Sequence, residues 1–196
     1  MKRPFLVALD LTERRCLVVG RSPEAARRAM ALLDSGARVT VIGENPCPEL
    51  EALAQRGSVE LHARSATPTD LDGTWLAVVT DAPRELAEEL GNVAAALRVW
   101  FCAVDRPEHN SYAHVAIARA GPVSVGISTG GRAPALGRRL REELERVFDE
   151  ADLERFAQHL AKRRTEIPPG KRGEVLGRAV AGLAFEGRLR VPDEED

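Results

Sequence analysis

The chain has 196 residues, of which 44% are hydrophobic and 30% are charged, and its formal net charge is −2. This length and composition are typical of a globular protein with one full α/β domain and a smaller appended part. The small net charge gives no electrostatic basis for binding nucleic acid or an anionic membrane surface. The apolar run near the N-terminus stops at Asp10, too early for a signal peptide or a membrane span, so we expect a cytoplasmic protein.

The cysteines and histidines show no metal-ligand spacing. Cys16, Cys47 and Cys102 form no C-x-x-C pair, and two of them lie inside apolar runs typical of buried strands. The four histidines also lack the spacing of a familiar zinc site. We therefore expect core cysteines and no built-in metal.

The first part of the chain has the pattern of a βαβ unit. Residues 16–19 predict a buried strand, residues 23–33 a helix with apolar positions at helical spacing, and residues 39–42 a second strand. A strand, a helix and a strand within so short a stretch favour parallel neighbours joined by a right-handed crossover. This pattern is the core of a Rossmann-like half.

The turn between the first strand and its helix is a candidate phosphate site. Rossmann folds place glycines here in a G-x-G-x-x-G/A fingerprint, and this chain has Gly20, Ser22 and Ala25 at the three positions. Ser22 followed by Pro23 is a typical helix start, and backbone N–H groups at such a start can face a phosphate. We expect Gly20, Arg21, Ser22 and Pro23 to bind a cofactor, with an ordinary strand-to-helix connection as the alternative.

Polar residues also follow the other predicted strands. Glu44 comes roughly twenty residues after the glycine turn, where Rossmann folds place the acid that binds ribose hydroxyls. A solvated loop carboxylate is the alternative for Glu44. Thr80 and Asp81 end a buried strand, and Asp105 follows the apolar run at residues 99–104. Because ligands of open α/β sheets bind outside the carboxyl ends of the strands, we expect Glu44, Thr80 and Asp81 to bind the cofactor, and Asp105 is a further site candidate.

The remaining pattern completes the sheet and then changes. The sequence predicts helices at about residues 47–55 and 83–97 and a strand at residues 59–62. Residues 113–118 and 123–127 predict an antiparallel hairpin with its turn at residues 119–122. Helices follow at about residues 134–148, 152–162 and 171–183, before an acidic tail at residues 191–196 that we expect to be frayed.

The long helix at residues 134–148 carries an apolar stripe. Leu136, Leu140, Leu144 and Val147 lie on this stripe and need a partner surface, which a two-fold dimer most commonly supplies. The arginines of the same helix stand beside glutamates, which favours a solvated face over a nucleic-acid patch. We expect a homodimer.

Seven motifs in chain order carry a family resemblance. They are CLVVG at residues 16–20, SGARVTV at 35–41, WLAVVTD at 75–81, FCAVD at 101–105, NSY at 110–112, VGISTGG at 125–131 and APAL at 133–136. With these motifs the chain resembles the precorrin-2 dehydrogenases, which oxidise precorrin-2 to sirohydrochlorin and also form the N-terminal part of siroheme synthases. Some members also act as ferrochelatases. The ISTGG turn before a proline-containing helix start is the most diagnostic of the motifs.

The resemblance implies a fold, a cofactor and an assembly. The fold is α/β, with a Rossmann-like, NAD-binding parallel sheet at residues 1–112, a dimerisation segment of hairpin and helix at residues 113–149, and a small helical C-terminal domain with an acidic tail at residues 150–196. The implied cofactor is NAD, and the implied substrate is the tetrapyrrole precorrin-2.

The resemblance also implies roles for individual residues. Asp105 matches the essential acid/base, although a strand-end turn residue is the alternative. One carboxylate beside the ring suits this chemistry, because hydride transfer from the reduced tetrapyrrole to the nicotinamide also releases protons. Arg106 and Arg119, both expected in loops, could bind substrate carboxylates or be scattered surface arginines. The resemblance places the substrate-site turn at Ser128, Thr129, Gly130, Gly131 and Arg132, and a turn hydroxyl that caps the next helix is the alternative for Ser128.

Two departures from the family pattern keep other functions open. Family members usually have three glycines where this chain has Gly20, Arg21 and Ser22, and a proline where it has Val115. The first departure bears on NAD binding, for which Arg21 could compensate by contacting a phosphate. The alternatives to a dehydrogenase are a tetrapyrrole-binding protein that has lost NAD binding and a protein that acts only as a chelatase.

Overall fold

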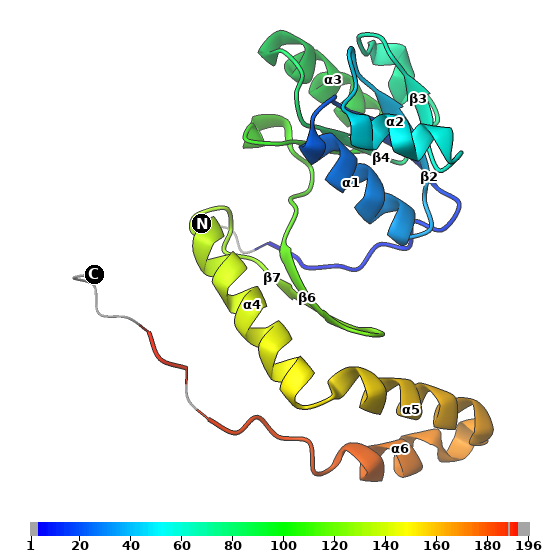
Figure 1. Ribbon diagram of the computed structural model, residues 1–196, viewed down its shortest axis with the longest axis vertical. Coiled ribbons are helices and arrows are strands. Elements are labelled where there is room, and N and C mark those ends of the chain that lie inside the picture. The colour runs from blue at the N-terminus through cyan, green and yellow to red at the C-terminus, as the bar shows by residue number, and fades with distance from the viewer. Residues whose placement is uncertain (1–3, 188, 192–196) are drawn as a thin grey trace. The chain divides into compact units, whose positions relative to one another are not determined.

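The computed structural model describes residues 4–187 and 189–191 (Figure 1). Two compact units make up the chain, Phe5–His114 and the part that begins at Val115. Residues 192–196 of the predicted acidic tail lie outside the described residues. None of the described helices combines the length and the hydropathy needed to cross a membrane.

The first unit is built on a five-stranded parallel sheet with the order β3-β2-β1-β4-β5. The strands are β1 (Arg15–Val19), β2 (Arg38–Ile42), β3 (Glu60–His62), β4 (Leu76–Val79) and β5 (Trp100–Ala103). The strand order reverses between β1 and β4, which is the topological switch point of a Rossmann-like half. The predicted α/β fold with a parallel sheet is confirmed.

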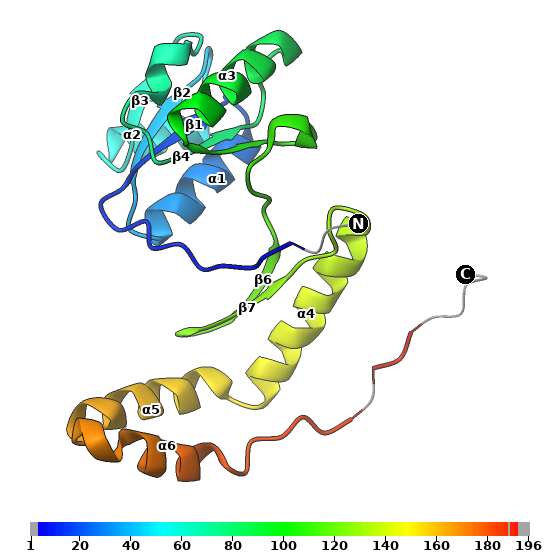
Figure 2. The ribbon, with the colours of Figure 1, turned by 180° about the vertical axis from the view of Figure 1, so that it is seen from behind.

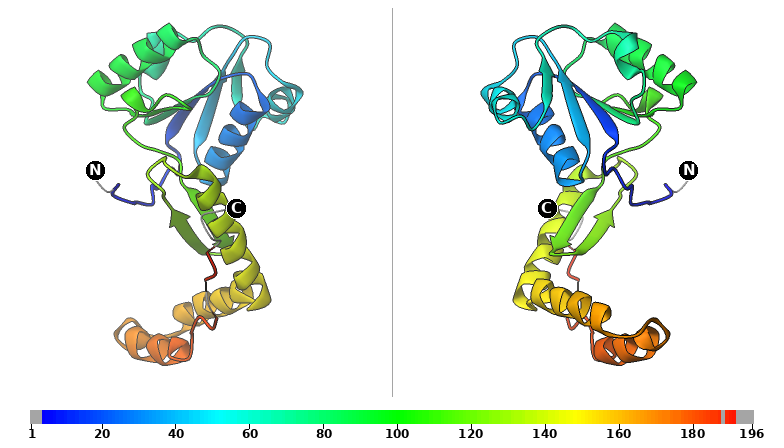
Figure 3. Two further views of the ribbon diagram at one scale, coloured as in Figure 1. Left: turned by 90° about the vertical axis from the view of Figure 1, so that its left-hand side faces the viewer. Right: turned by 90° about the vertical axis from the view of Figure 1, so that its right-hand side faces the viewer.

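Helices cover both faces of this sheet. Figure 3 shows α1 (Pro23–Asp34) and α2 (Pro48–Gln55) on one side and α3 (Arg84–Leu97) on the other. Successive side chains of a strand point to opposite faces, so Val18 of β1 packs in the cluster of α1 and α2, whereas Leu17 packs in the cluster of α3. This explains why the strands are nearly all apolar. Short 3-10 turns lie at η1 (Pro68–Leu71) and η2 (Pro107–His109).

The cysteines of the strands belong to the core. Cys16 and Cys102 are buried, and burial raises the pKa of both thiols, that of Cys16 to about 11. Thiols held in this way stay protonated at neutral pH and behave as small apolar side chains. The expectation of core cysteines is confirmed for these two residues, while Cys47 is half-buried.

The second unit consists of a hairpin and helices (Figure 2). Its elements are β6 (Ala116–Ala120), β7 (Val123–Ile127), α4 (Pro134–Glu150), α5 (Leu153–Glu166), the 3-10 turn η3 (Pro169–Lys171) and α6 (Arg172–Val180). The antiparallel hairpin is confirmed, but its turn is shorter than predicted, because Arg119 pairs with Ser124 in the ladder. Arg119 therefore lies in a strand, and the expectation that it lies in a loop is wrong. Gly121, at φ +53°, supplies the left-handed residue that such a tight turn needs.

The apolar stripe of α4 is divided between two environments. Leu144 and Phe148 pack against Ala118 and Ala120 of the hairpin, so part of the stripe finds its partner within the same chain. Leu136, at the other end of α4, is 53% exposed. Arg139, Arg141 and Arg146 of the helix are paired with its glutamates, which agrees with a solvated face. The exposed Leu136 at the N-terminal end of the stripe is available to meet another surface.

Candidate functional site

A cavity of about 250 Å³ opens beyond the carboxyl ends of the central strands of the first unit. Gly20 and Arg21 follow β1, Glu44 follows β2, Arg64 follows β3 and Asp81 follows β4, and all five line this cavity. The sheet thus brings together residues that are far apart in the sequence. Among the predicted cofactor residues, Ser22, Pro23 and Thr80 lie beside the cavity, in the segments that form its wall.

Two glycines let the strand ends meet at this wall. A Cβ atom on Gly20 would lie 1.9 Å from Oγ1 of Thr80, and one on Gly43 would lie 2.3 Å from the carbonyl oxygen of Gly20. Neither position has room for a side chain unless its neighbours move, because these distances are far shorter than a van der Waals contact. Gly20 was expected to matter, whereas the need for Gly43 depends on a contact between two turns that the sequence does not reveal.

The carboxylate of Asp81 is the centre of a hydrogen-bond network in this wall. Its Oδ2 accepts four hydrogen bonds: from the backbone N–H groups of Arg21 (3.0 Å) and Ser22 (3.1 Å), and from the hydroxyls of Ser22 (2.8 Å) and Thr80 (2.8 Å). Burial opposes its ionisation, but these bonds outweigh that effect and hold the pKa of Asp81 below its usual value. The N–H groups of the glycine turn are therefore directed at an anion that the chain itself supplies.

The start of α1 differs from the local expectation. Ser22 is the N-cap residue, with extended φ and ψ of −85° and 171°, but its hydroxyl makes no capping hydrogen bond to the helix. The hydroxyl instead donates to the carboxylate of Asp81 at 2.8 Å, a charge-assisted hydrogen bond. Pro23 follows as the first helical residue and has no N–H to offer. This leaves the N–H groups of Glu24 and Ala25 as the first-turn donors.

Arg64 is a site residue that the sequence analysis missed. Asp70 binds its guanidinium in a bidentate pair, with distances of 2.8 Å from Nη1 and 2.6 Å from Nη2. The Arg64 hydrogen bonds are the main reason that the pKa of Asp70 falls from 3.8 to about 2. Asp70 is itself held by the backbone N–H of Thr67 (2.8 Å) in a capping box. This local T-x-x-D spacing is the one signal that could have drawn attention to Asp70.

Asp105 stands at the carboxyl end of β5, at the edge of the sheet. The residue is exposed and has a φ of +61°, a left-handed conformation that costs a non-glycine residue free energy. Its carboxylate makes no ion pair within residues 4–187 and 189–191. Such strain at an accessible polar residue is a feature of functional sites.

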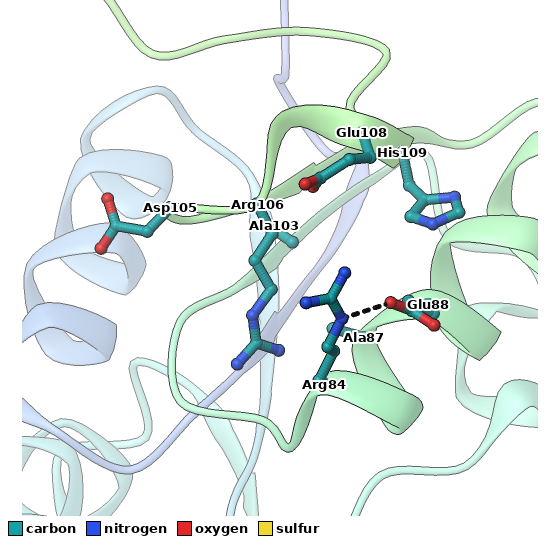
Figure 4. A pocket seen from close by; sticks show the side chains of 8 residues that line it. All are labelled: Arg84, Ala87, Glu88, Ala103, Asp105, Arg106, Glu108 and His109. Carbon is teal, nitrogen blue, oxygen red and sulfur yellow. Dashed lines mark hydrogen bonds and ion pairs between the residues drawn. The ribbon is translucent and has the colours of Figure 1, made fainter.

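A second cavity, of about 200 Å³, lies beside Asp105 (Figure 4). In Figure 4 the guanidinium groups of Arg84 and Arg106 face the same space, whereas the carboxylate of Asp105 points away from them. Arg84 is paired with Glu88 at 2.7 Å, and Arg106 donates to the carbonyl of Ala82 at 3.0 Å. The arginines are thus held near Asp105 without neutralising it.

Two polar side chains hold the loop that carries Asp105. Oδ1 of Asn110 accepts a hydrogen bond from the N–H of Ala103 (2.7 Å), and its Nδ2 donates to the carbonyl of the same residue (3.1 Å). The hydroxyl of Ser111 accepts a hydrogen bond from the backbone N–H of Phe101 (2.8 Å), and the backbone N–H of Ser111 donates to the carbonyl of Phe101 (2.9 Å). These bonds close the outer edge of β5 and fix both ends of the loop.

The predicted substrate-site turn belongs to the second unit. Its five residues, Ser128 to Arg132, lie between β7 and α4. Gly130 and Gly131 have φ values of +63° and +76°, and the N–H of Gly130 donates to the hydroxyl of Ser128 at 3.3 Å. The hydroxyl of Thr129 accepts from the N–H of Ala133 at 3.4 Å. The turn is therefore a left-handed glycine loop whose hydroxyls bond to its own backbone.

Within the described part of the chain, no three His, Cys, Asp or Glu side chains gather in a way that could hold a metal ion. The site candidates are therefore the carboxylates, arginines and backbone groups described above.

Comparisons with known proteins agree with the resemblance that the motifs indicated. A family described as "Putative NAD(P)-binding" matches residues 7–116, and one described as "Sirohaem biosynthesis protein central" matches residues 120–146. Siroheme synthase 3 of Aeromonas hydrophila is 38% identical over 145 residues, which cover 74% of this chain and 31% of that protein. Siroheme synthase 2 of Klebsiella pneumoniae is 34% identical over 156 residues, or 79% and 34% of the two chains.

A solved structure named SirC, precorrin-2 dehydrogenase, has a similar fold. Its TM-score is 0.76 at 22% sequence identity, and the match covers 90% of this chain and 89% of that chain. The predicted combination of a Rossmann-like sheet with a hairpin and helices is thereby confirmed. This chain spans about a third of the length of the curated relatives, 31% in the case of Siroheme synthase 3.

Proposed function

We propose, since the chain belongs to the NAD(P)-binding family that matches residues 7–116, that it oxidises precorrin-2 to sirohydrochlorin with NAD in siroheme biosynthesis. The sirohaem family match at residues 120–146 and the names of the relatives support this reaction. The motif resemblance points to the same reaction.

One observation carries the proposal. Asp105 is exposed at the carboxyl end of β5 and strained at φ +61°, and the Asn110 hydrogen bonds to Ala103 hold its loop in place. Aspartate adopts this conformation more readily than most residues, and Glu13, Asn45, Arg98 and Asp152 share it, so the strain alone does not single out Asp105. The exposure of Asp105 and its place after β5, where ligands of open α/β sheets bind, support a role toward the substrate.

The chemistry assigns Asp105 the role of proton acceptor. Oxidation removes one hydride and one proton from precorrin-2, and NAD, when bound, accepts the hydride. The carboxylate of Asp105 accepts the proton and then passes it to water. Its exposure favours this exchange. If the protein also inserts iron, the same carboxylate can accept protons from the pyrrole nitrogens.

Part of the first cavity fits NAD well. Glu44 is exposed at the end of β2, so its carboxylate can accept hydrogen bonds from ribose hydroxyls. Glu44 lines the cavity of about 250 Å³, so we place the adenosine portion of NAD there. At the glycine turn the fit is poorer, because Asp81 already accepts hydrogen bonds from the N–H groups of Arg21 and Ser22.

The substrate is a polycarboxylate and needs cations and donors. We assign Arg106, beside Asp105, and the turn Ser128, Thr129, Gly130, Gly131 and Arg132 to substrate binding. We also propose a homodimer, since Leu136 is 53% exposed and a two-fold interface would cover it. The proposed site of action is the cytoplasm.

The deciding experiment is incubation of the purified protein with precorrin-2 and NAD. Sirohydrochlorin should appear, as measured by its absorbance, and Asp105→Asn should lower the turnover about 100-fold or more. Thermal unfolding of the variant serves as the control for its fold. The proposal fails if the wild-type protein forms no sirohydrochlorin while a known dehydrogenase does so in parallel, and the role of Asp105 fails if the variant is fully active.

A second candidate function is tetrapyrrole binding or iron insertion without NAD. The engagement of the turn N–H groups by Asp81 favours it. Titration of the protein with NAD in a calorimeter separates the two candidates, because saturable binding supports the dehydrogenase. Iron insertion into supplied sirohydrochlorin, together with no oxidation of precorrin-2, would instead indicate a protein that acts only as a chelatase.

A further inference from the structure

The donors at the glycine turn are already in use. In a Rossmann fold the N–H groups of this turn face the pyrophosphate of the dinucleotide. Here the N–H groups of Arg21 and Ser22 donate at 3.0 and 3.1 Å to one oxygen of Asp81, and the Ser22 hydroxyl adds a third hydrogen bond at 2.8 Å. Each of these N–H groups has a single hydrogen to donate, so a phosphate and Asp81 cannot both bind them fully.

The charge of Asp81 adds to this competition. The hydrogen bonds keep its pKa low, so the carboxylate is ionised at neutral pH. A pyrophosphate placed against the same N–H groups would bring its negative charge within a few ångströms of the carboxylate. Like charges at such a distance repel each other, most strongly where solvent is partly excluded. Pro23 offers no N–H, so the donors left to a phosphate in the first turn are the N–H groups of Glu24 and Ala25, one turn position further along the helix.

We infer that Asp81 is an internal competitor of the cofactor's pyrophosphate and limits the affinity of this protein for NAD. The inference rests on the proposed function, because it concerns the cofactor of that reaction. Asp81 fills the anion position of the turn, and NAD is held mainly through its adenosine end, near Glu44. Binding of the phosphates requires the Asp81 side chain to leave the N–H groups of Arg21 and Ser22.

A series of ligands tests this inference directly. Adenosine has no phosphate, whereas ADP and NAD carry the pyrophosphate. Calorimetry should show that Asp81→Ala binds ADP and NAD about tenfold or more tightly than the wild-type protein does, with little change for adenosine. Asp81→Asn keeps the shape and the acceptor oxygen but lacks the charge, so its gain should be smaller and again confined to the phosphate-bearing ligands. Glu51→Gln, which removes an exposed charge on α2, is the matched control and should bind all three ligands like the wild type.

Each other outcome has a clear meaning. Weaker binding of ADP and NAD by both Asp81 variants would show that Asp81 shapes the turn for the cofactor, and would overturn the inference. An equal gain for adenosine would overturn it too, because the phosphate would not be involved. Should Asp81→Ala not fold, as judged by thermal unfolding, Asp81→Asn alone decides. If the wild-type protein oxidises precorrin-2 with NAD and the variants bind all ligands unchanged, only the inference fails. If neither the wild type nor the variants bind any of the ligands, the proposed function fails with it.

Discussion

Asp81 follows β4 and Asp105 follows β5, two neighbouring strands of one parallel sheet. Both residues lie at the carboxyl end of the sheet, yet their surroundings differ. Oδ2 of Asp81 accepts four hydrogen bonds from Arg21, Ser22 and Thr80. Asp105 is exposed, left-handed at φ +61° and without an ion pair in the described part of the chain. Position after a strand therefore does not define what an acid does.

The difference lies in which groups the strand order puts nearby. β4 pairs with β1, so Asp81 meets the turn that follows β1 and its unpaired N–H groups. β5 is at the edge of the sheet, and its outer side is closed by Asn110 and Ser111 rather than by another turn with free donors. The first acid is held by hydrogen bonds within the chain, whereas the second is exposed.

The largest expected effect comes from replacing Asp105 by glycine. Asp105→Gly should lose about 100-fold or more in turnover, because the proton acceptor is gone. The same variant should be more stable by up to about 1 kcal/mol, since glycine adopts a positive φ without strain. Turnover of precorrin-2 and chemical unfolding measure the two effects. Asp81→Gly should lose stability, and if Asp105→Gly loses stability as well, the contrast between the two acids is wrong.

Gly20→Ala tests how tightly the wall around Asp81 is packed. The added Cβ would lie 1.9 Å from Oγ1 of Thr80 and 2.8 Å from Oδ2 of Asp81, so the network has to move. We expect a loss of about 3 kcal/mol in the free energy of unfolding, as for severe overpacking. Gly177→Ala in α6 is the control, because its Cβ would meet nothing within 4 Å and alanine favours a helix. An unfolding midpoint unchanged by Gly20→Ala would mean that the turn adapts easily.

Local patterns predicted much of this region but not its contacts. The strand and helix order, the position of Gly20 and the placement of Asp105 after β5 followed from periodicity and from the motif resemblance. The bonds between Asp81 and Ser22 did not, because the two residues are 59 positions apart and a strong local signal marked Ser22 as a helix cap. Similarly, the polar motif at Asn110 gave no sign that its side chain would close the edge of β5. Long-range hydrogen bonds depend on the strand order, which a linear pattern does not contain.

A third aspartate, Asp70, should make the stability of the protein moderately dependent on pH. Its pKa in the folded protein is about 2, below the ordinary value of 3.8, mainly because Arg64 donates to it. Its contribution to stability is therefore complete above about pH 5 and is lost as the pH falls through 3.8 to about 2. Since Arg64 is 46% exposed, we expect only about 1 kcal/mol. Urea unfolding at several pH values measures it, and Asp70→Asn should remove this part of the pH dependence while the exposed Asp72→Asn should not.

The smallest expected effect separates the hydroxyl of Ser22 from its Cβ. The hydroxyl is one of the four donors to Oδ2 of Asp81, at 2.8 Å, so its loss loosens the carboxylate without freeing it. Ser22→Ala should therefore bind NAD about twofold to threefold more tightly, as measured by calorimetry. Ser22→Gly should bind at least as tightly, because it also removes the Cβ beside the position of the phosphate. If only the glycine variant gains affinity, steric access to the turn limits NAD binding. If both variants gain equally, the hydrogen bond from the Ser22 hydroxyl to Asp81 limits it. If neither variant gains affinity, Ser22 does not contribute to the competition between Asp81 and the cofactor.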